Sequence, residues 1–196
     1  MPRTRTKTKA TIEYLDEKTE INRENYLYYV GIDPSYSSTG FVVLDQESNT
    51  PIVAATIRAG NPKDPFIKRM QRLLDRISEL MVHLDRENTL VCMEGAAFAS
   101  EFGAFKLGKL SGVLEYYLGS NNIPYCLVAP TYVKKVATSN GAATKDQVIA
   151  GVRHRWGYKN SNNDINDAYV MAQIARGALP IPKEKPKPKK ATRSKE

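Results

Sequence analysis

The order of the apolar segments constrains the fold of this chain more than any other feature of the sequence. Three short runs rich in β-branched and aromatic residues come first, at residues 26–32, 41–44 and 52–57. Runs of this composition favour strands, and only short turn-like segments separate them. The three runs therefore predict an antiparallel meander.

From residue 66 onward, patterns typical of helices and of strands alternate. The predicted helices cover residues 66–84, 102–118, 145–156 and 164–176, and the predicted strands cover 89–94 and 123–129. A meander followed by alternating elements predicts an α/β fold, in which helices flank a mixed sheet of five strands. No helix is predicted between residues 130 and 144.

Both ends of the chain differ in composition from the segment between them. Residues 1–25 are polar, with too few apolar positions to anchor a helix, and we interpret them as an extension. Residues 180–196 alternate Pro and Lys and are expected to be a disordered basic tail. Residues 26–179 are expected to form one domain, because a chain of 196 residues suits a single core.

The formal net charge of +8 suggests an anionic partner, but the excess lies at the two ends. Residues 1–10 hold four basic and no acidic residues, and residues 181–196 hold seven basic and two acidic ones. The folded segment is close to neutral, so the total charge predicts no basic surface; the ends either grip phosphate or are simply solvated. No apolar run could span a bilayer and no secretory signal is visible, which predicts a cytoplasmic protein without a membrane partner.

The two cysteines lie inside apolar runs. Cys92 and Cys126 have no partner at metal-ligand spacing. We expect two buried free thiols rather than a disulfide or a zinc site.

Four acidic residues stand at places where a sheet of this kind binds ligands. Asp33 and Glu94 each follow an apolar strand directly, and the carboxyl ends of parallel strands meet at one edge. Asp164 and Asp167 are three positions apart at the start of the last helix, so they share a face. The four carboxylates are expected to converge.

Clustered carboxylates repel one another unless a cation neutralises them, and hard oxygen ligands select Mg²⁺ or Mn²⁺. Two such ions about 4 Å apart activate a water and stabilise the departing oxygen of a phosphodiester. The set therefore predicts metal-assisted phosphodiester hydrolysis. Each residue alone has another interpretation: Asp164 as a helix cap or a partner of the helix dipole, Asp33 as a turn residue, and Glu94 as the partner of a lysine.

Three segments carry a resemblance to a known family. Residues 31–40 read GIDPSYSSTG, residues 105–113 read FKLGKLSGV and residues 163–168 read NDINDA. They resemble the opening motif, the central helix and the terminal Asp-x-x-Asp-Ala of the RuvC-type Holliday junction resolvases of bacteria and their phages. That family belongs to the RNase H-like superfamily, and the resemblance spans about residues 28–178.

The resemblance implies a function and a set of residues. It implies an RNase H-like nuclease domain at residues 26–179 and a homodimer that nicks four-way DNA junctions symmetrically with Mg²⁺ or Mn²⁺, two ions per site. It implies a bacterial or phage source. Asp33, Glu94, Asp164 and Asp167 match the family's metal ligands. Lys134 and Lys145 match its two essential lysines, which implies a catalytic contact with phosphate.

The sequence also departs from the family pattern. Ser35 replaces the usual Gly of the opening motif, and Ala97 replaces an aromatic residue that stacks on bases. We expect Phe98 or Phe102 to take over stacking on DNA.

Three alternatives were weighed against this interpretation. A broader branch or flap nuclease of the same fold, and a nucleic-acid-binding module without catalysis, both stay open, although the complete carboxylate set favours an enzyme. Actin-like ATPases and sugar kinases share the opening pattern but need two such domains and do not end in Asp-x-x-Asp.

Overall fold

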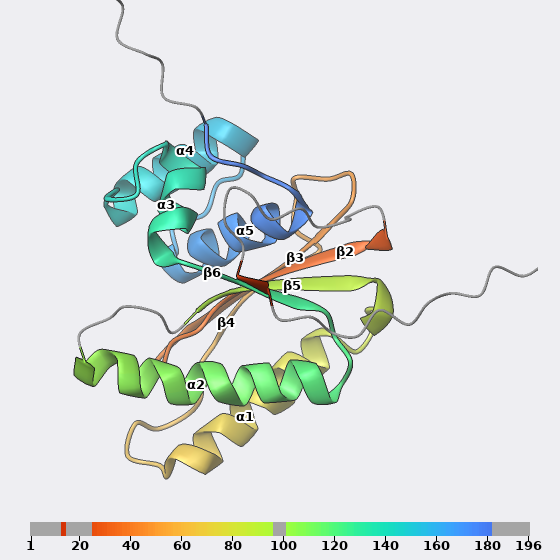
Figure 1. The fold of residues 1–196 in the computed structure, drawn as a ribbon, viewed down its shortest axis with the longest axis vertical. Helices are drawn as coiled ribbons and strands as arrows, with labels where there is room; N and C mark the ends of the chain where they lie inside the picture. The colour runs from red at the N-terminus through yellow and green to blue at the C-terminus, as the bar shows by residue number, and fades with distance from the viewer. Residues whose placement is uncertain (1–12, 15–24, 96–100, 182–196) are drawn as a thin grey trace, which may run out of the picture.

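A mixed sheet forms the centre of the molecule in the computed structural model, which describes residues 13–14, 25–95 and 101–181. Its strands are β1 (Glu13–Tyr14), β2 (Tyr28–Asp33), β3 (Thr39–Asp45), β4 (Val53–Ile57), β5 (Thr89–Glu94) and β6 (Tyr125–Val128). They lie in the order β1-β6-β5-β2-β3-β4 (Figure 1). β2, β3 and β4 pair antiparallel, which confirms the predicted meander, and β5 and β6 continue the sheet in parallel.

All five predicted strands are present, and the sheet has one strand more than predicted. β1 pairs parallel with β6 at the sheet edge and lies in the segment interpreted as an extension. Two residues are too few to show an alternating pattern, and a strand this short depends on the backbone groups that β6 offers at its edge. The rest of residues 1–24 and the predicted basic tail beyond residue 181 lie outside the described residues.

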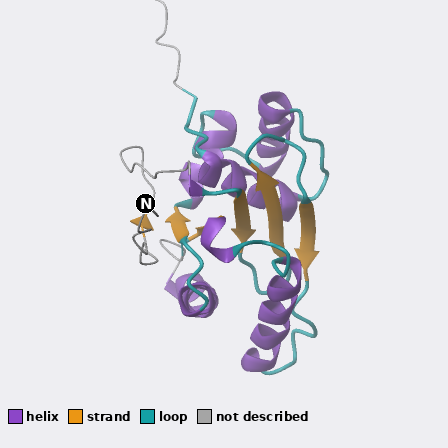
Figure 2. Cartoon of the chain, turned by 90° about the vertical axis from the view of Figure 1, so that its right-hand side faces the viewer, coloured by secondary structure: helices purple, strands orange, loops and turns teal. Residues whose placement is uncertain are grey.

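Helices cover both faces of the sheet (Figures 1 and 2). α1 (Phe66–Leu80) and α2 (Glu101–Ser120) lie on one face; α3 (Pro130–Thr138), α4 (Lys145–Trp156) and α5 (Asn163–Arg176) lie on the other. The alternation of side chains along β2 serves both layers: Val30 and Ile32 join the core under α1 and α2, and Tyr29 joins the core under α5. None of the described helices is long and apolar enough to cross a bilayer.

One helix and one helix end differ from the predictions. α3 was not predicted, because its nine residues include a proline and several β-branched side chains. Pro130 occupies the first turn, where a missing N–H costs nothing, and so begins the helix. α1 ends at Leu80 rather than at residue 84, and a short 3₁₀ turn, η2 (Arg86–Asn88), leads into β5.

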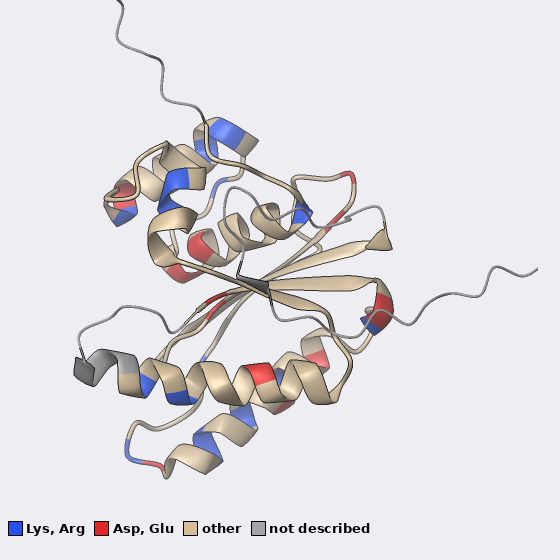
Figure 3. Cartoon of the chain, viewed as in Figure 1, with Lys and Arg blue, Asp and Glu red and all other residues tan. Residues whose placement is uncertain are grey.

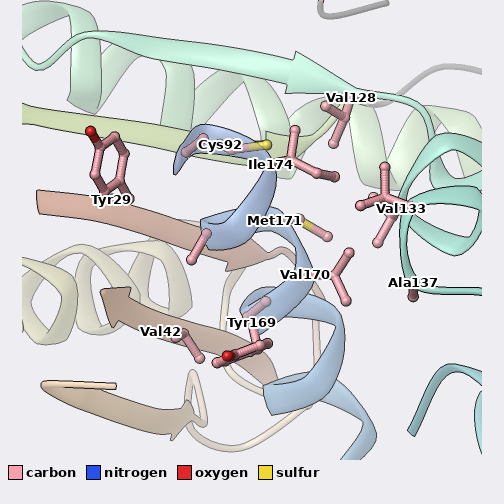
Figure 4. Close-up of a cluster of buried hydrophobic side chains, with 14 of the residues drawn as sticks. Tyr29, Val42, Cys92, Val128, Val133, Ala137, Tyr169, Val170, Met171 and Ile174 are labelled. Carbon is pink, nitrogen blue, oxygen red and sulfur yellow. The ribbon is translucent and has the colours of Figure 1, made fainter. Parts of the chain in front are cut away.

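α5 lies directly on β2 and β3 with no side chain between them at two points. A Cβ at Gly31 would collide with the carbonyl oxygen of Ala168, and one at Gly40 would collide with that of Asp164. Figure 4 shows the apolar cluster that fills the remaining space, including Val42, Tyr169 and Met171. The two glycines therefore set how closely the start of α5 approaches the end of β2.

The two cysteines are free and buried, as predicted. Cys92 and Cys126 are register partners on β5 and β6 and belong to the core under α5.

Candidate active site

Asp33 and Glu94 end two neighbouring parallel strands. β2 and β5 run in register, with Ile32 opposite Met93, so the next residue of each strand carries a carboxylate at the same edge of the sheet. Both side chains are half-buried. Their positions follow from the strand-end placement that the sequence indicates.

Asp164 and Asp167 lie in the first two turns of α5, and neither caps that helix. The cap is Asn162, whose side-chain oxygen accepts a hydrogen bond from the Ile165 N–H at 3.2 Å. The structural interpretation of Asp164 as the helix cap is therefore wrong. Its carboxylate instead accepts a hydrogen bond from the Ser38 hydroxyl at 2.5 Å, across from the β2–β3 turn.

The four carboxylates act on one another electrostatically. Burial raises the pKa of Asp33 well above its ordinary value, and repulsion from Asp167, Glu94 and Asp164 raises it further. Burial and then repulsion from Asp167 raise the pKa of Glu94 to about 7. Burial also raises the pKa of Asp167, with a smaller contribution from Asp164. The structure thus brings together all four residues that the sequence predicts.

Two lysines face the same cluster from the helical layer above it. Lys134 on α3 opposes the rise in the pKa of Glu94 and Asp167, and Lys145 at the start of α4 opposes it for Asp33 and Asp167. Neither lysine forms a direct ion pair with a carboxylate in the described part of the chain. Basic positions on α3 and α4 and acidic positions on α5 and the strand ends share one side of the molecule (Figure 3).

The donor set fits a hard divalent cation. Within the described residues, no three acidic, histidine or cysteine side chains stand close enough to form a metal site by themselves. Mg²⁺ does not need such a site, because it keeps several waters and binds one or two carboxylates together with substrate phosphates. Burial and mutual repulsion raise the pKa of Asp33 and Glu94 by more than the two lysines lower it, and a bound cation would stabilise the charged form of these carboxylates.

Ser38 is a contact of this site that the sequence alone did not indicate. Its only sequence signal is its place in the polar turn of residues 34–40, where serine is common for reasons of turn geometry. Its bond to Asp164 spans 126 positions of the chain and depends on the packing of α5 on the sheet.

The structure does not describe the side chains of the two residues expected to stack on DNA bases. Phe98 lies outside the described residues, and only the backbone of Phe102 is described, in α2. One turn further along α2, Phe105 is 64% exposed, with the Lys109 ammonium 4.9 Å from its ring centroid.

Comparisons with known proteins agree with the motifs. The family model described as Crossover junction endodeoxyribonuclease RuvC matches residues 29–175. The RuvC crossover junction endodeoxyribonuclease of Anaeromyxobacter sp. (strain Fw109-5) is 31% identical over 160 residues, which cover 78% of this chain and 76% of that protein. Its counterpart in Anaeromyxobacter dehalogenans (strain 2CP-1) is 30% identical over 159 residues, covering 78% and 83% respectively.

A solved structure shares the fold. T. thermophilus RuvC in complex with a Holliday junction substrate superposes with a TM-score of 0.63 at 22% sequence identity, covering 80% of this chain and 100% of that one.

Proposed function

The chain belongs to the RuvC family of crossover junction endodeoxyribonucleases, and we propose that it is a divalent-metal-dependent endonuclease that resolves four-way DNA junctions. The observation that carries this proposal is the convergence of four carboxylates, those of Asp33, Glu94, Asp164 and Asp167. Asp33 is repelled by the other three, and Asp167 also repels Glu94. A non-catalytic DNA-binding module would have no use for four carboxylates gathered where burial and repulsion oppose their charge. We expect the enzyme to work in the cytoplasm of a bacterial cell.

In this role Asp33, Glu94, Asp164 and Asp167 would hold Mg²⁺ or Mn²⁺, with two ions per site. Ions bound there would supply an activated water and charge stabilisation for the departing oxygen of the phosphodiester. Lys134 and Lys145 carry positive charges that act on the cluster, and in this role their ammonium groups stabilise charge on the scissile phosphate.

The outer face of α2 supports a homodimer. Phe105 is 64% exposed and Tyr116 is 77% exposed, and their spacing of three turns places them on one face of the helix. Between them, a Cβ at Gly112 would meet nothing within 4 Å, so a second helix has room to approach. Two chains related by a two-fold axis would present two active sites to the two equivalent strands of a junction.

A broader branch or flap nuclease is the second candidate function. The observation that favours it is Ala97, which stands where the family often carries an aromatic residue that stacks on bases. Loss of that contact would weaken the selection of the crossover without altering the carboxylates.

One cleavage assay distinguishes these functions. The purified chain is incubated with a four-way junction, a 5′ flap and a linear duplex, with Mg²⁺ or with a chelator. Junction resolution predicts metal-dependent nicks at paired positions of the four-way junction only. Equal cleavage of the flap favours the broader nuclease, and no cleavage of any substrate that the protein binds contradicts the enzymatic proposal.

A further inference from the structure

The turn between β2 and β3 follows Asp33 directly, and its Ser38 side chain contacts the start of α5. Other side chains of the turn hold it in shape. Thr39 is 1% exposed, and its hydroxyl donates to the Ser35 carbonyl at 3.1 Å and accepts from the Ser35 N–H at 3.3 Å. The turn is therefore closed by Thr39, the first residue of β3. Ser38, the residue before Thr39, faces α5.

The opposite side of the turn is anchored to the other helical layer. The Tyr36 hydroxyl donates to the carbonyl of Lys106 on α2 at 2.8 Å. Arg69 of α1, which is 8% exposed, donates to the Tyr36 carbonyl and lies over the Tyr36 ring. Held by α1 and α2, the turn is a fixed support for whatever Ser38 contacts.

The Ser38 hydroxyl donates to Oδ2 of Asp164 at 2.5 Å. Next to it, Gly40 packs against the backbone of Asp164 so closely that a Cβ would not fit. Both partners of the bond are thus held in place, one by the turn and the other by the contact between β3 and α5. Asn162, not Asp164, supplies the side-chain cap of α5.

We propose that Ser38 is a positioning residue that fixes the Asp164 carboxylate for metal binding. The Ser38 hydroxyl is hydrogen-bonded to Oδ2 of Asp164, so Oδ1 would be available to a metal ion. The same bond restricts rotation of the Asp164 carboxylate. Partners of this kind behind a ligand typically contribute 10–100-fold to metal affinity or activity. The role of Ser38 rests on the proposed metal-dependent function, since a carboxylate without an ion needs no such orientation.

Metal binding measured without DNA tests this role. The thermal unfolding midpoint is followed as Mn²⁺ is titrated, because an ion that binds only the folded state stabilises it by an amount that grows with the logarithm of the ion concentration relative to its dissociation constant. We expect Ser38→Ala to raise the Mn²⁺ concentration needed for the same rise in the midpoint by about 10-fold. Ser38→Thr keeps a hydroxyl and should restore the original concentration. Ser37→Ala is the matched control, because among the described residues the Ser37 hydroxyl bonds to Ser35 of the same turn and not to Asp164.

A double substitution separates this role from a general loss of folding. If Ser38 acts through Asp164, Ser38→Ala should change nothing further in a chain that already carries Asp164→Ala. If Ser38→Ala needs no more Mn²⁺ than the unsubstituted chain for the same rise in the midpoint, or if the losses add in the double variant, the role of Ser38 is overturned. If the unsubstituted chain shows no rise with Mn²⁺ at all, the proposed metal-dependent function fails together with it.

Discussion

The α carbon of Gly40 packs against the backbone carbonyl of Asp164, at the point where β3 passes under the first turn of α5. Gly40 is also the register partner of Asp33. This one close contact therefore brings together two carboxylates that are 131 positions apart in the chain.

The first prediction concerns that contact. Gly40→Ala places a methyl group where the Asp164 carbonyl lies, so β3 and α5 must separate. We expect a loss of about 1–3 kcal/mol in the free energy of unfolding and a loss of metal-dependent cleavage, because α5 carries Asp164 and Asp167. Urea unfolding and junction cleavage measure the two effects.

Gly119→Ala is the control for Gly40→Ala. Nothing lies within 4 Å of a Cβ at Gly119, and alanine in a helix should stabilise the protein by up to about 1 kcal/mol. Equal stability of the two variants would contradict the proposed role of Gly40.

The second prediction is a pH dependence of stability. The folded-state pKa of Glu94 is about 7, raised by burial and by Asp167 above its ordinary 4.5. The folded state therefore holds its proton more tightly than the unfolded state, so this group destabilises the metal-free protein progressively as the pH rises from about 4.5 through about 7. Relative to the unsubstituted chain, Glu94→Gln should gain roughly 1–3 kcal/mol in unfolding free energy at pH 8 and little at pH 4. Urea unfolding in a chelator tests this; a gain independent of pH would contradict the expectation.

The third prediction concerns the two lysines. Lys134→Ala and Lys145→Ala should each slow single-turnover cleavage by about 100-fold, with junction binding largely kept, because each removes a positive charge that we propose stabilises the scissile phosphate. Lys135→Ala is the matched control on α3, since Lys135 is not among the charges that shift the pKa of Asp33, Glu94 or Asp167. A loss of binding that accounts for the whole loss of cleavage would assign the lysines to DNA affinity instead.

The fourth prediction concerns the outer face of α2. Tyr116→Arg should convert a dimer to a monomer in sedimentation experiments and replace paired nicks by single ones, because it buries an unpaired charge in the proposed interface. Ile67→Arg on α1 changes an equally apolar side chain, which is 63% exposed, and should leave the dimer intact. A monomer at all concentrations in the unsubstituted chain would show that α2 does not mediate association.

The sequence predicted those parts of the molecule that depend on local patterns. Strand alternation and helical spacing are short-range properties, so the meander, the remaining strands and the starts of α1 and α4 were confirmed within a residue or two. The meeting of Asp33 with Glu94 followed from parallel strand ends, and the shared face of Asp164 and Asp167 followed from helical geometry. The role of this set in metal binding stays a prediction.

What the sequence did not predict depends on long-range packing. α3 begins at a proline after a buried strand, and its helical face becomes apparent only when Val133 and Val136 meet the core under α5. Lys134 therefore seemed to lie in a loop, and only the family resemblance selected it. β1 needs the edge of β6, and Ser38 needs the approach of α5. In each case the partner is distant in the chain, and no periodic pattern encodes it.

Cleavage of a labelled four-way junction by Asp33→Asn tests most directly whether the carboxylate set is the metal site of the nuclease. Asparagine keeps the shape of the side chain but removes the charge at the centre of the carboxylate set, where burial and Asp167 act most strongly. Single-turnover rates are measured with saturating Mg²⁺, and gel-shift binding is measured in a chelator. We expect a rate at least about 100-fold lower with unchanged junction binding. Cleavage by Asp33→Asn at the rate of the unsubstituted chain would mean that the metal site lies elsewhere and that Asp33 is not a metal ligand.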